Sequence, residues 1–359
     1  MIPKYLQISD QLRAQLTGNE RASIQKLPTE QELCEHFHAS RQTIRHALQI
    51  LEQEGLIERR QGSGAYATGL HPDSEHNQIA VLLPTDSDYT YAKLRSELQL
   101  PLVKEGFAVS FFLTEFKLSR EREILHQLLE LPLRGLIIDP VKNALPNPNL
   151  DYYERLWSKR VPTVFLQQPY LGFPQQPFVC SDDYDGGRQA AQYLLARHHT
   201  KIATLLPSDS ISGMKRYLGI LHACNESHIT WDDRHLAWYS DEEWSALQKK
   251  QATGFLSDFI RRKLGTCSAV ICHNDEIAYW LIKELSISGR HVPEDISVIS
   301  FDNSYLCDFS VPGLTSFGHR QTLASTAANT LLSQMRGQDS ASVTLSFHLY
   351  ERDSCHSLA

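Results

Sequence analysis

The chain has 359 residues, more than one ordinary domain holds, and this length predicts two or three domains. Its composition, 42% hydrophobic and 21% charged, is that of a globular protein and excludes extensive disorder. The net charge of −7, which by itself disfavours nucleic-acid binding, belongs entirely to residues 70–359, because residues 1–69 hold eight basic and eight acidic side chains.

Three helices are predicted at the start of the chain. Apolar side chains recur at helical spacing over residues 3–17. A second helix begins in LPTEQEL, where Thr29 as N-cap and Glu32 three residues later form a capping box. A third begins after Ser40, another good N-cap, and runs to Gly55, which suits the position after a helix end.

A glycine-tipped hairpin is predicted next, in LIERRQGSGAYAT. Three helices followed by such a hairpin form a winged helix-turn-helix. In this motif the start of the last helix meets base edges and phosphates, so Arg41 and Arg45 are candidate DNA contacts. Lys4, near the start of the first helix, and Arg60, beside the wing, are candidate phosphate contacts. The alternative is that these basic side chains are only part of a solvent-exposed surface and contact no DNA.

The same segment resembles the GntR family of DNA-binding regulators. The matching pieces are KYLQI, LPTEQEL, FxxSRQTIRxAL, LEQEGLI and QGSGAYA, with Ala65-Tyr66 where the family usually has Thr-Phe. This resemblance implies operator DNA as a partner. The base and phosphate contacts that it implies are Arg41, Gln42, Thr43, Arg45, Gln61 and Gly62.

The domain division follows from composition. Residues 1–69 form the predicted DNA-binding head. Residues 70–77 are polar, contain proline and show no periodicity, which predicts a linker. Residues 78–359 form the predicted second domain. In that domain β-branched apolar runs alternate with amphipathic stretches, a pattern typical of α/β folds with parallel sheets covered on both faces. At least eight such runs predict two similar lobes, with ligands bound beyond the carboxyl ends of the strands or between the lobes.

This second domain resembles the LacI/GalR sensor domain, which is similar to periplasmic sugar-binding proteins. The matching pieces are SDDYDGGRQAAQYLL, GMKRYLG, CHNDEIA and GRHVPEDISVISFDNS. With SDY, DPVKNALPNPNL and the GntR-type head, the whole chain resembles AraR-type, arabinose-responsive repressors of Gram-positive bacteria. The resemblance implies a homodimer with a small sugar effector, L-arabinose first. Two segments depart from the family pattern: Ser208-Asp209-Ser210, and Gly318-His319-Arg320 in place of a proline-containing turn.

The predicted sugar site needs paired acceptors and donors for hydroxyl groups, with a ring against the apolar sugar face. Asp275 as acceptor and Arg216 as donor match positions that the sensor family uses for its sugar. Further candidates at strand ends are Tyr89, Lys142, Asp183, Tyr239, His273 and Asn274. Two alternatives stay open: Asp183 only caps the helix starting at Tyr184, or Lys142 only pins the proline-rich loop.

No catalytic, metal or cofactor motif is found in the sequence. The phosphate loop and the G-x-S-x-G elbow are absent, and the histidine pairs lack a second pair of ligands at usable spacing. Seven scattered cysteines without C-x-x-C predict no disulfide framework. No apolar run reaches about 20 residues, and the N-terminus is amphipathic rather than a signal peptide, so a cytoplasmic protein without a membrane partner is expected.

The predicted function is that of a transcriptional repressor which leaves its operator when a sugar binds. The alternatives are a sugar-acting enzyme whose head controls its own gene, and a transport binding protein. The missing catalytic motifs disfavour the enzyme, and the DNA-binding head disfavours the transport protein.

Overall fold

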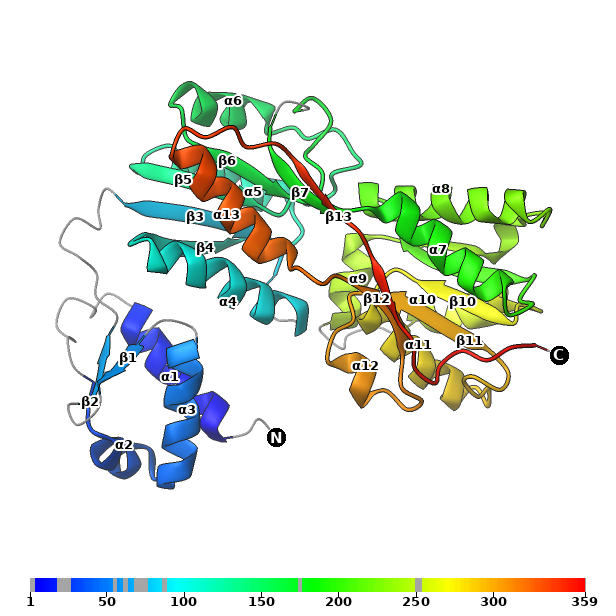
Figure 1. The fold of residues 1–359 in the computed structure, drawn as a ribbon, viewed down its shortest axis with the longest axis horizontal. Helices are drawn as coiled ribbons and strands as arrows, with labels where there is room; N and C mark the ends of the chain where they lie inside the picture. The colour runs from blue at the N-terminus through cyan, green and yellow to red at the C-terminus, as the bar shows by residue number, and fades with distance from the viewer. Residues whose placement is uncertain are drawn as a thin grey trace.

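The computed structural model describes residues 4–17, 27–53, 57–60, 64–67, 77–85, 89–173, 176–248 and 254–358. They form a small N-terminal head and two larger α/β lobes (Figure 1). The predicted linker, except Asn77, lies outside the described residues. Among the described helices, none combines the length and the apolar character needed to cross a bilayer.

The head is a winged helix-turn-helix. Its elements are α1 (Lys4–Thr17), α2 (Glu30–Phe37), α3 (Arg41–Gln53), β1 (Ile57–Arg60) and β2 (Gly64–Ala67). The predicted capping box is present: the Thr29 side chain accepts from the backbone N–H of Glu32, and the Glu32 carboxylate accepts from the backbone N–H of Thr29 at 2.7 Å. The strands pair antiparallel, as a wing requires. One apolar cluster, which includes Ile44 and Leu48, joins the three helices to the wing.

The first lobe, here the N-lobe, is a six-stranded parallel sheet in the order β13-β7-β6-β5-β3-β4. Helices α4 and α13 cover one face, and α5 and α6 cover the other. Its elements are β3 (Gln78–Leu83), α4 (Tyr89–Lys104), β4 (Ala108–Leu113), α5 (Leu118–Leu128), β5 (Leu133–Ile138), α6 (Leu150–Ser158), β6 (Thr163–Leu166), β7 (Phe178–Ser181), α13 (Leu323–Met335) and β13 (Val343–Leu345).

The second lobe, here the C-lobe, has the strand order β14-β12-β11-β10-β8-β9, and only the pair β12–β14 is antiparallel. Its elements are α7 (Asp183–Leu195), β8 (Ile202–Pro207), α8 (Ile211–Glu226), η3 (Asp233–His235), β9 (Leu236–Tyr239), α9 (Asp241–Gln248), α10 (Gly254–Phe259), η4 (Ile260–Leu264), β10 (Ala269–Cys272), α11 (Asp275–Ile287), β11 (Ser297–Phe301), α12 (Leu306–Phe309), β12 (Thr315–Gly318) and β14 (His348–Tyr350). The prediction of two parallel-sheet lobes is confirmed.

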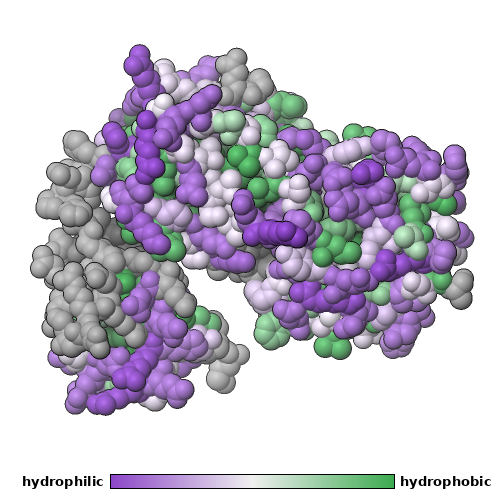
Figure 2. All heavy atoms as spheres, viewed as in Figure 1, coloured by the Kyte–Doolittle hydropathy of each residue, from purple (hydrophilic) through white to green (hydrophobic). Residues whose placement is uncertain are grey.

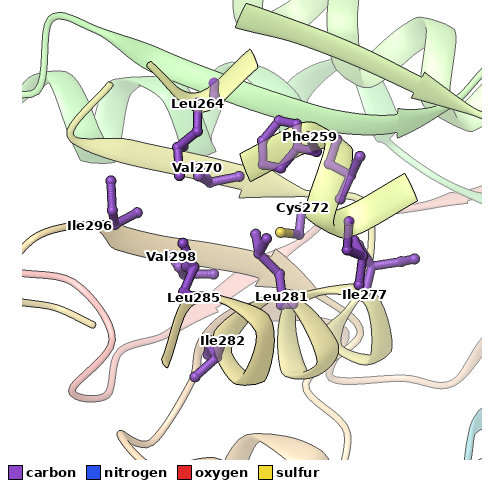
Figure 3. Close-up of a cluster of buried hydrophobic side chains, with 14 of the residues drawn as sticks. Phe259, Leu264, Val270, Cys272, Ile277, Leu281, Ile282, Leu285, Ile296 and Val298 are labelled. Atoms are coloured by element: carbon purple, nitrogen blue, oxygen red, sulfur yellow. The ribbon is translucent and has the colours of Figure 1, made fainter. Parts of the chain in front are cut away.

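Apolar clusters on both faces of each sheet explain why the strands read as continuous apolar runs. Figure 3 shows one of them in the C-lobe, where Leu281 and Leu285 of α11 point toward Cys272 of β10 and Val298 of β11. This packing seats α11 against the sheet. The helix start, with Asn274 and Asp275, therefore lies at the carboxyl end of β10.

Candidate functional site

The start of α3 carries the predicted DNA contacts. Arg41 and Gln42 are exposed, while Thr43 is half-buried and its hydroxyl lies 2.8 Å from that of Ser40. The Ser40 hydroxyl also accepts from the backbone N–H of Thr43 at 3.2 Å, so Ser40 caps the helix as predicted. The first turn of α3 thus presents the polar side chains of Arg41 and Gln42 to solvent.

Two further cations lie beside this turn. Arg45, with a side chain 65% exposed, donates from Nε to Glu30 of α2 at 2.9 Å. Lys4 donates from Nζ to the carbonyl of His38, in the turn between α2 and α3, at 2.6 Å. These contacts bring the start of α1 and the start of α3 to one side of the head. Arg60 is the last residue of β1, its side chain lies outside the description, and Gln61 and Gly62 lie outside the described residues.

In the sensor, Arg216 and Asp183 form a buried ion pair. The Arg216 side chain is 6% exposed and that of Asp183 4%, and Nε and Nη2 each lie 2.8 Å from Asp183 Oδ1. The pair forms because α7 and α8 approach backbone to backbone. A Cβ on Gly187 would lie 2.1 Å from the Arg216 carbonyl, and one on Gly219 would lie 2.0 Å from the Tyr184 carbonyl.

This pair decides between the two interpretations of Asp183. The N-cap of α7 is Asp182, which accepts from the backbone N–H of Asp185 at 3.1 Å, so the capping interpretation of Asp183 is wrong. Burial raises the pKa of the Asp183 carboxyl, and the adjacent Arg216 guanidinium opposes that rise.

Arg216 also contacts His273 at the end of β10. The guanidinium donates to the His273 carbonyl, lies 3.3 Å from the ring Nδ1, and stacks over Phe301 with 4.0 Å between guanidinium carbon and ring centroid. Burial and the positive charge of Arg216 lower the pKa of His273 well below its ordinary value. His273 is therefore a neutral imidazole, and because a guanidinium only donates, Nδ1 accepts from Arg216 and Nε2 can donate to a hydroxyl.

Asn274 and Asp275 follow His273 in the chain, and both side chains form hydrogen bonds within the protein. Asn274 is the N-cap of α11 and accepts from the backbone N–H of Ile277 at 3.0 Å. Asp275 is fully buried, and its carboxylate accepts from the Ser300 hydroxyl at 2.5 Å, the Ser316 hydroxyl at 2.6 Å and the backbone N–H of Ser304 at 2.6 Å. Asp275 thus ties the ends of β10, β11 and β12 together and presents no surface to a sugar in this arrangement.

The other predicted contacts are spread along the edge between the lobes. Tyr239 ends β9, stacks on Trp244 with 5.8 Å between centroids, and has a buried hydroxyl without a hydrogen-bond partner among the described residues. Lys142 of the N-lobe does more than pin its own loop: its Nζ lies 4.0 Å from Asp209 and 3.9 Å from Glu242, both in the C-lobe. Tyr89 is the first residue of α4, and its side chain lies outside the description.

Three carboxylates at strand ends were not predicted. Asp139 follows β5 and accepts from the Tyr91 hydroxyl at 3.1 Å, Asp209 follows β8, and Asp241 follows β9. Burial, together with the Asp209 carboxylate, raises the pKa of Asp241 to about 7, and burial raises that of Asp139 to about 7. The Oδ1 atom of Asp209 is buried without a partner among the described residues. An acid within two residues of a strand's carboxyl end is the signal that finds all three.

The two lobes meet at these residues. The backbone N–H of Ala144 donates to the Asp209 carbonyl at 3.2 Å, and that of Ile211 donates to the Asn143 side chain at 2.9 Å. Beside this contact lies an interlobe pocket of about 480 Å³, a volume suited to a small ligand. It is lined by Glu115, Phe116, Lys117, Leu118, Ser119, Lys142, Asp241, Glu242, Ser245 and Ala246.

Comparisons with known proteins identify relatives of both the head and the two-lobed part of the chain. Residues 4–66 match the gntR family of bacterial regulatory proteins, and residues 191–355 match a periplasmic binding protein-like domain. An arabinose metabolism transcriptional repressor of Geobacillus stearothermophilus is 31% identical over 341 residues, which cover 94% of this chain and 93% of that protein. The chain belongs to the family of these transcriptional repressors. A second such repressor, of Halalkalibacterium halodurans, is 28% identical over 89% of this chain and 85% of its own length.

Solved structures give the repressor the same fold. The transcriptional regulator CelR in complex with cellobiose superposes with a TM-score of 0.67 at 21% identity, over 88% of this chain and 91% of that one. The transcription regulator CcpA of Lactococcus lactis superposes with a TM-score of 0.66 at 20% identity, over 78% of this chain and 99% of that one. The two arabinose metabolism repressors regulate transcription, so this chain is a transcriptional regulator, and the alternative of a sugar-acting enzyme is set aside.

Proposed function

We propose that the repressor binds an operator upstream of sugar-utilisation genes through residues 1–69 and leaves it when L-arabinose binds between the lobes of residues 78–359. The observation that carries this proposal is the joining, in one chain, of an exposed recognition helix and an interlobe site with unpartnered buried polar atoms. The choice of L-arabinose rests on the arabinose metabolism repressor that is 31% identical. An operator-bound regulator of this kind acts in the cytoplasm.

In the head, Arg41, Gln42 and Thr43 are the proposed base contacts. Arg45 is held by Glu30 in free protein and exchanges this carboxylate for a phosphate or a guanine on the operator. Lys4 has the reach for a phosphate next to the turn. Arg60, Gln61 and Gly62 are the proposed contacts of the wing with the operator, as the sequence predicts.

In the sensor, the polar groups along the interlobe edge are the proposed sugar contacts. The buried Asp209 Oδ1 and the Tyr239 hydroxyl each cost about 1–3 kcal/mol while unpaired, and sugar hydroxyls repay this cost. Lys142, His273 and the outer edge of Arg216 supply further donors and acceptors. Asp139 and Asp241 join this set, and Tyr89 remains a predicted contact. Asp183, Asn274 and Asp275 position these contacts without touching the sugar. Asp183 holds Arg216, and Asn274 and Asp275 fix the start of α11.

Binding of the sugar lowers operator affinity by closing the lobes around it. The chain that leaves the head enters the N-lobe at β3. A change in the angle between the lobes therefore alters the relative position of the two heads of a dimer. Coupling of this kind is about 5- to 150-fold and reciprocal, so operator DNA weakens sugar binding by the same factor.

The repressor binds its operator as a homodimer, and each head of the dimer occupies one of two half-sites in the DNA. An apolar surface at α12 suits its C-lobe contact. Phe309 is 73% exposed and Val311 89%, and Tyr305 packs against Phe309 with 5.8 Å between ring centroids. Figure 2 shows hydrophobic atoms at the lower edge of this lobe, where α12 lies in Figure 1. Exposed residues of this size seldom lie together without a partner.

Two experiments test the proposal. Calorimetric titration of the full-length repressor with a panel of pentoses and hexoses is expected to select L-arabinose, and another sugar winning would refute the choice of effector. Sedimentation of Phe309→Asp against wild type tests the dimer surface, with Leu171→Asp as a matched control on the N-lobe, where Leu171 is 62% exposed. The dimer surface is wrong if both variants sediment like wild type.

A further inference from the structure

Three stretches of chain pass between the lobes in the described part of the sensor. The first joins β7 to α7 through Ser181 and Asp182, the second joins β12 to α13 through residues 319–322, and the third joins β13 to β14 through Ser346 and Phe347. They cross at the waist between the lobes (Figure 1). Any rotation of one lobe relative to the other must change the backbone of all three.

One side chain, His319, ties these crossings together. It belongs to the second crossing, its Nε2 lies 2.9 Å from the Ser181 hydroxyl of the first, and its Nδ1 lies 2.9 Å from the Ser346 carbonyl of the third. Because a carbonyl only accepts, Nδ1 carries the proton and Nε2 accepts from Ser181. The ring also stacks on Phe347 at 4.4 Å and 27°. The backbone N–H of Asp182 donates to the Leu345 carbonyl at 2.9 Å and joins the first and third crossings independently.

The same ring lies next to the buried pair of the sugar site. Phe347 packs against His319 on one side and against Phe301 at 5.2 Å, and the Arg216 guanidinium carbon lies 5.3 Å from the Phe347 centroid. Asp183, the partner of Arg216, is two residues after Ser181. A displacement of Arg216 or Asp183 is therefore passed directly to His319 through packed rings and through the first crossing.

We propose that His319 is the hinge clamp of the sensor: it is a positioning residue that holds the three crossings in the closed arrangement seen here. The arrangement is closed because the loops around Asn143 and Asp209 touch across the lobes. Loss of the clamp favours the open lobes. The repressor then requires more sugar for release, although no atom that touches the sugar has changed. This role rests on the proposed sugar response and adds the hinge to it.

The test compares His319→Phe with His126→Phe, which makes the same change on the exposed face of α5. Without any sugar, amide exchange of the peptides spanning Ser181–Asp183 and Ser346–His348 is expected to speed up about 10-fold or more in His319→Phe and to stay unchanged in His126→Phe. This factor is the size expected for two lost hydrogen bonds. Unchanged exchange in His319→Phe overturns the clamp, whatever the effector is.

The response to sugar supplies the second measurement. In wild type, L-arabinose must release the operator; if it does not, the proposed effector fails while the exchange measurement still decides on the clamp. If it does, His319→Phe is expected to raise the midpoint of release about 10-fold while operator affinity without sugar does not fall. Ser181→Ala is expected to give part of this shift, and the double variant no more than His319→Phe alone. Additive shifts in the double variant would overturn the clamp. A fall in operator affinity without sugar as large as the shift in the midpoint would indicate only a folding defect and would also overturn it.

Discussion

Removing the carboxylate of Asp183 is expected to destabilise the sensor far more than removing an exposed one. Asp183→Ala leaves the Arg216 guanidinium in a site where its side chain is only 6% exposed. Breaking one partner of a buried pair costs about 3–5 kcal/mol. The exposed pair Arg120–Glu123 has a shorter contact, 2.6 Å against 2.8 Å, but its side chains are 47% and 61% exposed. Glu123→Ala is therefore expected to cost less than about 1 kcal/mol.

Urea unfolding at pH 7 followed by tryptophan fluorescence measures this difference. All five tryptophans of the chain lie between residues 157 and 280, so the signal reports the sensor and is silent on the head. Arg216→Met combined with Asp183→Asn removes both charges and is expected to recover most of the loss. A cost of Asp183→Ala as small as that of Glu123→Ala would refute the reasoning from burial.

Three further outcomes are expected. Arg45→Ala abolishes specific operator binding in a mobility-shift assay while calorimetric sugar binding stays intact; normal operator affinity would mean that the recognition helix is misplaced. Thr29→Ala removes the capping box and lowers the head's stability by about 1 kcal/mol, measured by amide exchange in α2, and no change in exchange would contradict the role of the cap. The raised pKa of Asp241, about 7, means that the folded state holds a proton which the unfolded state has lost, so this group lowers sensor stability from about pH 4 to pH 7, by at most about 1.4 kcal/mol per pH unit. Asp139, whose pKa is also raised to about 7, adds a similar fall, so Asp241→Asn is expected to reduce the slope in urea titrations by its own share. An unchanged slope in that variant would assign it to another group.

The local elements follow from the sequence because their causes are local. The capping box of Thr29 and Glu32 and the apolar spacing of α3 specify the head within a few residues. Continuous apolar runs predicted buried parallel strands, and both sheets have them. Arg216 and His273 were proposed from the sequence as sugar contacts, because they lie in motifs that resemble the sensor family, and this role stays a prediction.

Tertiary structure decided what each polar side chain does. Asp182 and Asp183 are adjacent acids in the sequence, and only the close approach of α7 and α8 makes one a helix cap and the other the partner of Arg216. Asp275 matched a ligand position, yet two donors from later strands and one from the loop after β11 enclose it.

The largest omission from the sequence prediction was the contact between lobes. Asp209 and Lys142 meet across the cleft, and His319 meets Ser181 and Ser346, through pairs that are 67, 138 and 27 residues apart. Periodicity reports the environment within a few turns or a strand, so it specifies which elements form and which face is buried. Partners brought together from distant segments depend on how the chain crosses between the lobes, and that arrangement exists only in the folded molecule.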